Sequence, residues 1–199
     1  MRRSTLCDLA RSLGLLAVVA SVGGAQQPAL TAAPSTRATA TVTLNPPRGV
    51  EGASPARIRV DYGQPHLRGR TLHAGGLVPL DSVWRLGANE ATGLDTEVDL
   101  SIGGLPVPKG KYTLYALPTA AGWKLIINKN TGQWGTDYNA QHDLARIDLR
   151  RRSLATPVES FSIWLIPSTQ AGAPNGELRF VWGDTELSTN WNLRTGQSR

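Results

Sequence analysis

The chain has 199 residues, with 21 Lys and Arg against 15 Asp and Glu, and 40% of its residues are hydrophobic. This hydrophobic content excludes a wholly disordered chain, and 21 Gly and 13 Pro without a regular period exclude a collagen-like one. The length predicts a single domain.

Residues 1–25 have the pattern of a secretory signal peptide. A basic start precedes the apolar run Leu13–Val22, which ends in small residues near Ala25. The run is half the length of about 20 residues that a membrane-spanning helix needs. We therefore expect cleavage near Ala25, export to the periplasm or the extracellular space, and no stable membrane span after processing. Cleavage would remove Cys7, the only cysteine, so the mature domain would depend on a packed core.

The next segment, residues 26–38, is rich in Pro, Ala, Ser and Thr and has no apolar period, which predicts a disordered linker. A single domain is expected over 39–192, followed by a flexible tail at 193–199. Within the domain, apolar and polar residues alternate with the period of a strand. The expected strands are 39–44, 56–62, 83–86, 94–102, 111–117, 123–128, 144–150, 158–166, 177–182 and 185–188.

These eight to ten short strands are separated by turns that contain Gly and Pro. Such spacing predicts an all-β fold, either an antiparallel β-sandwich or an open barrel. No window of the mature chain keeps a helical period, so at most one short helix is expected, at 136–143.

Polar side chains gather in two neighbouring segments, and four of them are candidate site residues: Arg70, Arg85, Asn89 and Glu90. The two arginines offer planar donors for a carboxylate, phosphate or sulfate, the amide offers a further hydrogen bond, and the glutamate offers an acid or base. Two interpretations remain open. The side chains form a small pocket, or the arginines pair with Asp61, Asp81 or Glu90 and hold loops to the sheet.

The six tryptophans are many for a chain with two Phe. Trp123 and Trp182 are in phase with apolar neighbours and are expected in the core. Trp134 follows Gln133 in a predicted loop, where it either stacks on a sugar or another ring or packs over the open end of the sandwich.

Other chemistries have weaker support in the sequence. His66, His73 and Glu90 could together bind zinc, but the chain has no H-x-x-x-H or H-E-x-x-H pattern, so no metal and no cofactor are expected. Glycoside hydrolysis could pair Glu90 with Asp61 or Asp95. The basic run Arg150–Arg152 is typical of a solvated strand end, and no nucleic-acid partner is expected.

Several blocks of the chain resemble an uncharacterised bacterial secreted family, domain of unknown function 2911. The resemblance covers about 53–182 and rests on Asp61-Tyr62, Arg68-Gly69-Arg70, Gly75-Gly76-Leu77-Val78-Pro79, Val83-Trp84-Arg85, Gly87-Ala88-Asn89-Glu90-Ala91-Thr92, Val107-Pro108-Lys109-Gly110-Lys111-Tyr112 and Gln133-Trp134-Gly135. It implies an exported, mostly β protein and no particular reaction.

The sequence therefore favours a non-enzymatic module that binds a small anionic or carbohydrate ligand at Arg70, Arg85, Asn89, Glu90 and Trp134. A first alternative is a hydrolase or lyase that uses Glu90 as acid or base, which requires this carboxyl to be buried beside a cleft. A second alternative is a purely structural envelope protein. No feature of the sequence indicates the oligomeric state.

Overall fold

The computed structural model of the protein describes residues 30–74 and 76–194. The expected signal peptide at 1–25, the first part of the expected linker at 26–29, and residues 195–199 of the expected tail lie outside the described residues. Within the described ranges, no helix has both the length and the apolar character needed to cross a membrane.

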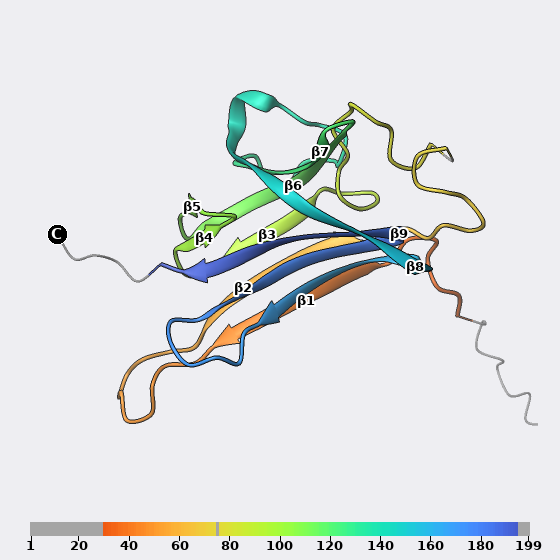
Figure 1. The fold of residues 1–199 in the computed structure, drawn as a ribbon. Coiled ribbons are helices and arrows are strands. Elements are labelled where there is room, and N and C mark those ends of the chain that lie inside the picture. The colour runs from red at the N-terminus through yellow and green to blue at the C-terminus, as the bar shows by residue number, and fades with distance from the viewer. Residues whose placement is uncertain (1–29, 75, 195–199) are drawn as a thin grey trace, which may run out of the picture. The chain divides into compact units, whose positions relative to one another are not determined.

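The all-β prediction is confirmed. The described residues form nine strands in one antiparallel sheet that is not closed, and their only helix is the 3-10 turn Ala140–His142 (Figure 1). The strands are β1 Arg37–Leu44, β2 Ala56–Gly63, β3 Thr92–Thr96, β4 Leu100–Ile102, β5 Leu105–Val107, β6 Gly110–Thr119, β7 Gly122–Asn128, β8 Asp143–Pro167 and β9 Asn175–Leu193. Their order across the sheet is β1-β2-β3-β6-β7-β8-β9-β4-β5.

Strand β9 folds back on itself. Its chain turns at Gly183, which has a φ of 57°, a backbone conformation that glycine adopts without strain. The Leu193 amide then donates to the carbonyl of Pro174 over 2.7 Å, which brings the two ends of the strand together. Figure 1 shows the two arms side by side. The expected strands 177–182 and 185–188 correspond to these arms.

Strand β8 follows both arms of β9. Its residues 150–153 pair with residues 185–188, and its residues 158–167 pair with residues 176–183. Because each pairing is antiparallel, β8 reverses direction at the tip of the β9 hairpin. The second half of β8 also meets the segment after β2, where the Leu67 and Phe161 amides donate across the junction.

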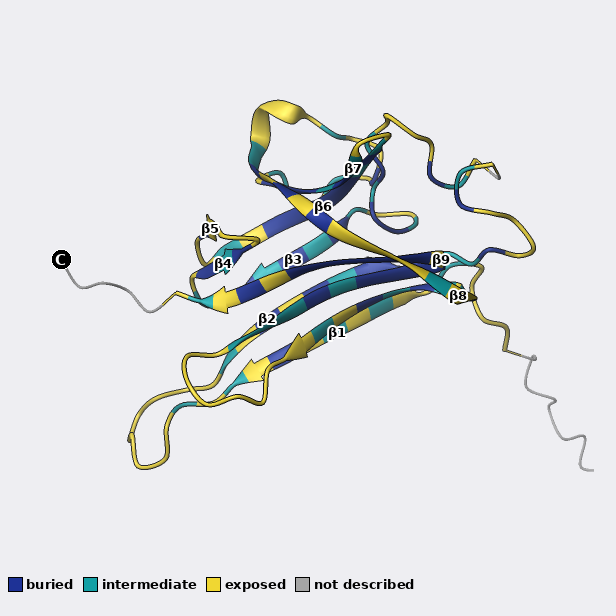
Figure 2. Ribbon diagram, viewed as in Figure 1, coloured by how far each residue is buried: buried dark blue, intermediate teal, exposed yellow. Residues whose placement is uncertain are grey.

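The core lies on the inner face of this curved sheet. More and less buried residues alternate along β1, β3 and the first half of β8, where every second side chain points inward, whereas β6, β7 and β9 carry longer buried runs (Figure 2). An aromatic cluster fills the interior, where Trp84 and Trp182 stack with ring centroids 5.7 Å apart and Phe161 packs edge-on against both. Trp123 and Trp182 are buried, as the sequence predicts.

Two expected strands differ from the observed ones. Residues 83–86 form only a single bridge, from Trp84 to Ala116, because Leu86 has a φ of 49° and turns the chain out of the strand. The expected strand 94–102 is interrupted between β3 and β4. There the Thr96 hydroxyl donates to the carbonyl of Val98 and accepts from its amide, which replaces strand pairing by a local turn.

Strand β1 begins earlier than the sequence analysis places it. It starts at Arg37, inside the segment expected to be a linker, because Ala38 and Ala40 continue the inward series of Val42 and Leu44. The residues just before β1 are also hydrogen-bonded, since the carbonyls of Pro34 and Thr36 accept from Arg68 and Gln64.

Candidate functional site

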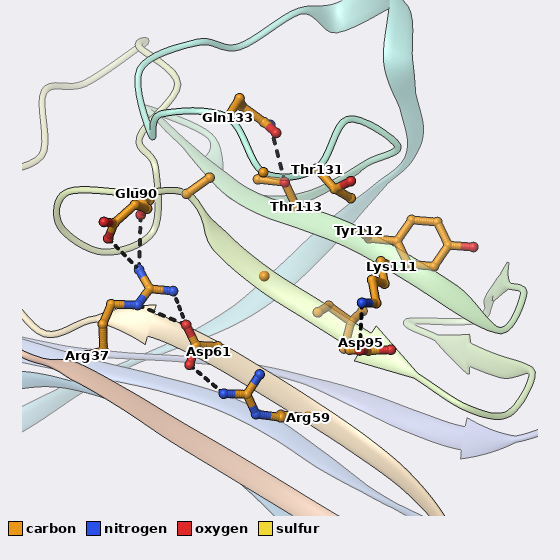
Figure 3. A pocket seen from close by; sticks show the side chains of 14 residues that line it. Arg37, Arg59, Asp61, Glu90, Asp95, Lys111, Tyr112, Thr113, Thr131 and Gln133 are labelled. Carbon is orange, nitrogen blue, oxygen red and sulfur yellow. Dashed lines mark hydrogen bonds and ion pairs between the residues drawn. The ribbon is translucent and has the colours of Figure 1, made fainter.

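A hollow of about 310 Å³ lies on the outer face of β2, β3 and β6, beneath the loop that follows β7. Figure 3 shows its polar side chains, which come from both the strands and the surrounding loops. Those labelled in the figure are Arg37, Arg59, Asp61, Glu90, Asp95, Lys111, Tyr112, Thr113, Thr131 and Gln133.

The hollow exists because a glycine occupies an outward-facing position in the middle of the sheet. Gly93 pairs with Asp61 on one side and with Thr113 on the other. A β-carbon at position 93 would have no heavy atom within 4 Å. In the next cross-strand row, Asp95 lies between Arg59 and Lys111. The backbone of Gly93 therefore forms the floor of the hollow, and charged side chains form its walls.

The charged walls are organised by arginine. The Arg37 guanidinium pairs with Asp61 and lies 3.5 Å from the Glu90 carboxylate, while Arg59 lies 2.8 Å from the second Asp61 oxygen. Partial burial raises the pKa of the Asp61 carboxyl, but hydrogen bonds from Arg37 and Thr39 outweigh burial, so the pKa lies below its ordinary value. Asp61 is therefore a carboxylate at neutral pH.

A strained loop presents Glu90. Both Leu86 and Asn89 have positive φ angles, of 49° and 62°, although neither is glycine. The Thr92 hydroxyl holds this shape by donating to the Leu86 carbonyl over 2.7 Å. The loop also lies directly against β2, where a β-carbon at Gly63 would overlap the carbonyl oxygen of Ala88. The backbone around Glu90 is thus fixed from two sides.

Glu90 and Trp134 lie on the same side of this loop. They form an antiparallel bridge, flanked by hydrogen bonds from Ala91 to Gln133 and from Gly135 to Asn89. Residues directly opposite in such a bridge point to the same face, and in this non-hydrogen-bonded type their side chains are close together. Glu90 lines the hollow, whereas Trp134 is not one of its lining residues. The indole of Trp134, which is 49% exposed, lies beside Glu90 on the same face of the bridge.

Gln133 forms part of the loop wall above β6. Its amide nitrogen donates to the Thr113 hydroxyl over 3.2 Å and to the Tyr115 hydroxyl over 3.0 Å. Its amide oxygen is buried and has no hydrogen-bond partner among the described residues. A buried acceptor without a partner is uncommon in native proteins.

The five residues singled out in the sequence divide among three positions. Glu90 lines the hollow, and Trp134 is its bridge partner outside the lining. Arg85 and Asn89 hold the strained loop, since Arg85 donates to the Asn89 carbonyl over 3.4 Å and the Asn89 amide donates to the Ser35 carbonyl over 3.3 Å. Neither of these two lines the hollow. Arg70 lines a separate hollow elsewhere.

Arg37 is the main residue that the sequence analysis missed. The sequence suggests Arg70 or Arg85 as the partner of Asp61 and Glu90, but the arginine that pairs with both comes from the start of β1. Its signal was the alternation of Ala38 and Ala40, which extends the strand back to Arg37 and turns that side chain outward.

The acid–base hypothesis required a buried Glu90. The Glu90 side chain is 62% exposed, and Arg37 is its only ion-pair partner in the described part of the chain. Each of the two histidines is hydrogen-bonded elsewhere, His66 to the distant Ser160 hydroxyl and His73 to the nearby Val78 carbonyl. Among residues 30–74 and 76–194, no three His, Cys, Asp or Glu side chains gather to hold a metal ion.

Comparison with known proteins gives a match to a protein family. A family model described as "Protein of unknown function (DUF2911)" matches residues 46–190, which include Glu90 and Trp134. No curated protein and no solved structure matches the chain.

Proposed function

The chain belongs to DUF2911, a family of proteins of unknown function, and we propose that it is a non-enzymatic module that binds a small neutral carbohydrate in the hollow at Glu90. The observation that carries this proposal is the bridge that sets the exposed Trp134 beside Glu90, which lines a polar, charge-balanced hollow.

The balance of charge favours a neutral ligand over an anion. The walls carry three cationic and three carboxylate side chains, which are Arg37, Arg59, Lys111, Asp61, Glu90 and Asp95. The cations already have partners, because Arg37 and Arg59 pair with Asp61, and Lys111 lies 3.9 Å from Asp95. A sugar hydroxyl both donates and accepts, so one ligand could donate to the carboxylates and accept from the cations.

Trp134, the bridge partner of Glu90, would supply the apolar contact that a sugar ring also needs. The indole of Trp134 is rigid and large, and its exposed face can cover the C–H face of a pyranose. The volume of about 310 Å³ lies at the lower end of the range for small-molecule sites, roughly 300–1,000 Å³. This size suits a monosaccharide or one terminal sugar of a longer chain.

The exposure of Glu90 supports binding without chemistry, since a general acid is usually tuned by burial. The signal-peptide pattern of residues 1–25 supports an exported module, which would meet sugars in the periplasm or outside the cell.

Calorimetric titration of the protein with a panel of monosaccharides, organic acids and phosphate tests this proposal. We expect at least one neutral sugar to bind and the anions to bind more weakly. Trp134→Ala should weaken sugar binding about tenfold, because it removes the stacking surface.

Trp164→Ala is the matched control, since Trp164 is also an exposed tryptophan (45%) but lies on β8 and is not paired with Glu90. It should bind the sugar as the unchanged protein does. Equal loss of binding in both variants, or no response to any sugar, would contradict the proposal.

A further inference from the structure

A second hollow, of about 290 Å³, lies where the segment after β2 meets the bend of β8 and the tip of the β9 hairpin. It shares no lining residue with the hollow at Glu90. Its walls include Leu67, Leu72 and Pro157, and its charged residues are Arg70, Glu159 and Asp184.

Arg70 is positioned by the backbone and not by a carboxylate. Its Nε donates to the Leu67 carbonyl over 3.0 Å and one terminal nitrogen donates to the His66 carbonyl over 3.2 Å. These bonds use two of the five N–H donors of a guanidinium. Among residues 30–74 and 76–194, no carboxylate oxygen lies within 4.0 Å of Arg70, so its charge has no ion-pair partner there.

The two carboxylates of this hollow are also held by neutral groups. Glu159 accepts from the Arg68 amide over 2.7 Å, and Asp184 accepts from the Thr185 hydroxyl over 3.1 Å. Neither has a cationic side chain within 4.0 Å in the described part of the chain. By contrast, the carboxylates of the first hollow, Asp61, Asp95 and Glu90, all have such a partner.

The hollow thus holds one cationic side chain and two carboxylates that form no ion pairs with one another. A ligand that carries both charges would satisfy both sides at once. We propose that this hollow binds a free α-amino acid with an apolar side chain. Its carboxylate pairs with Arg70, its ammonium pairs with Asp184 and Glu159, and its side chain packs on Leu67, Leu72 and Pro157.

Backbone geometry supports a preformed site. The carbonyl of Glu159 accepts from the Leu67 amide over 2.9 Å and from the Trp182 indole over 3.1 Å, which ties three walls of the hollow together. Leu72 packs against the hairpin tip, where a β-carbon at Gly183 would lie 3.2 Å from its side chain.

Calorimetric titration with L-leucine tests the proposal, together with two analogues that each lack one charge, 4-methylpentanoate and 3-methylbutylamine. We expect L-leucine to bind at least about tenfold more tightly than either analogue, since each analogue loses charge-assisted hydrogen bonds. Equal binding of L-leucine and one analogue would overturn the assignment, as would no heat from L-leucine up to about 10 mM.

Substitutions of lining residues test whether leucine binds in this second hollow. Arg70→Gln and Asp184→Asn should each weaken L-leucine binding about tenfold, and both substitutions remove the charge while keeping a polar side chain. Arg68→Gln is the control, because this neighbouring arginine does not line the hollow. Unchanged leucine binding in Arg70→Gln and Asp184→Asn would overturn the proposal. Sugar binding measured in parallel should be unaffected, so the two sites succeed or fail separately.

Discussion

Gly93 is the residue that gives the first hollow its depth. Its neighbours across the sheet, Asp61 and Thr113, carry side chains on the same outer face, with Thr113 buried beneath the loop after β7, so the missing side chain leaves a gap between them. Gly63 has a different role, because it lets the loop at Ala88 approach β2 closely. Two glycines thus shape the site. Gly93 leaves the space of the hollow empty, and Gly63 allows the loop at Ala88 to contact the backbone of β2.

Gly93→Val should close the hollow without harming the fold. The backbone at position 93 does not have a positive φ, and a β-carbon there meets no atom within 4 Å. Since glycine weakens a strand, the free energy of unfolding should stay the same or rise by up to about 1 kcal/mol. Sugar binding should be lost. Urea denaturation and calorimetry check the two parts, and retained sugar affinity would place the ligand elsewhere.

At the scale of elements, the connection between β7 and β8 depends on one buried amide. The side chain of Asn128 donates to the Asn139 carbonyl over 2.9 Å and to Asp143 over 2.8 Å, and it accepts from the Asn130 amide over 2.9 Å. Asp143 also accepts from Tyr138 over 2.7 Å. Burial and this bond to Asp143 raise the pKa of Tyr138 to about 12.

Asn128→Ala should loosen this connection, which carries Trp134. Removing three hydrogen bonds from a fully buried position should lower the free energy of unfolding by roughly 2–3 kcal/mol. Urea denaturation measures the loss, and hydrogen exchange of residues 129–142 should become faster. Asn45→Ala, at an exposed position, should change stability by less than about 0.5 kcal/mol. Equal effects of the two substitutions would contradict this account.

The sequence predicted where the strands lie along the chain better than which strands lie next to one another in the sheet. Alternation places Asp61 and Asp95 on outward faces, and the turn at Gly183 is visible in the sequence. Alternation gives no strand order, so it could not show that Arg37 meets Asp61, or that the loop of Glu90 pairs with that of Trp134. Such contacts depend on distant pairing, which local periodicity does not encode.

At the scale of the whole molecule, paired carboxylates on two separate surfaces set the response to acid. Arg152 holds Glu186 with two hydrogen bonds, of 2.9 and 2.8 Å, and lowers the pKa of that carboxyl. Burial raises the pKa of Glu177, but hydrogen bonds from Arg179 and Arg150 outweigh it and leave the pKa lowered. The pKa of Asp61 is lowered at the first hollow.

These shifts predict loss of stability at low pH. A carboxyl with a lower pKa in the folded state stabilises the protein above its unfolded pKa, here 3.8 to 4.5, and this contribution disappears as pH falls through the folded value. Urea denaturation should therefore give constant stability from neutral pH to about pH 5 and a decline below it.

Glu186→Gln separates this effect from general charge repulsion. The variant should be less stable than the unchanged protein at pH 7, and the difference should shrink as the pH falls below 4.5. Glu51→Gln, at an exposed loop position, should behave as the unchanged protein at each pH. A difference for Glu186→Gln that stays constant with pH would contradict the assignment of this carboxyl.

The β9 hairpin also affects how fast the domain folds. The two halves of β8 hydrogen-bond along its two arms, and β4 pairs with residues 191–193, about ninety positions later in the chain. Pairings between such distant segments make folding slow, since a large loop must close before any bond is gained. Until the hairpin arrives, β4 and β8 expose backbone edges that can pair with other chains. Strand β9, which comes last in chain order among the described strands, therefore ends the period in which the domain can aggregate.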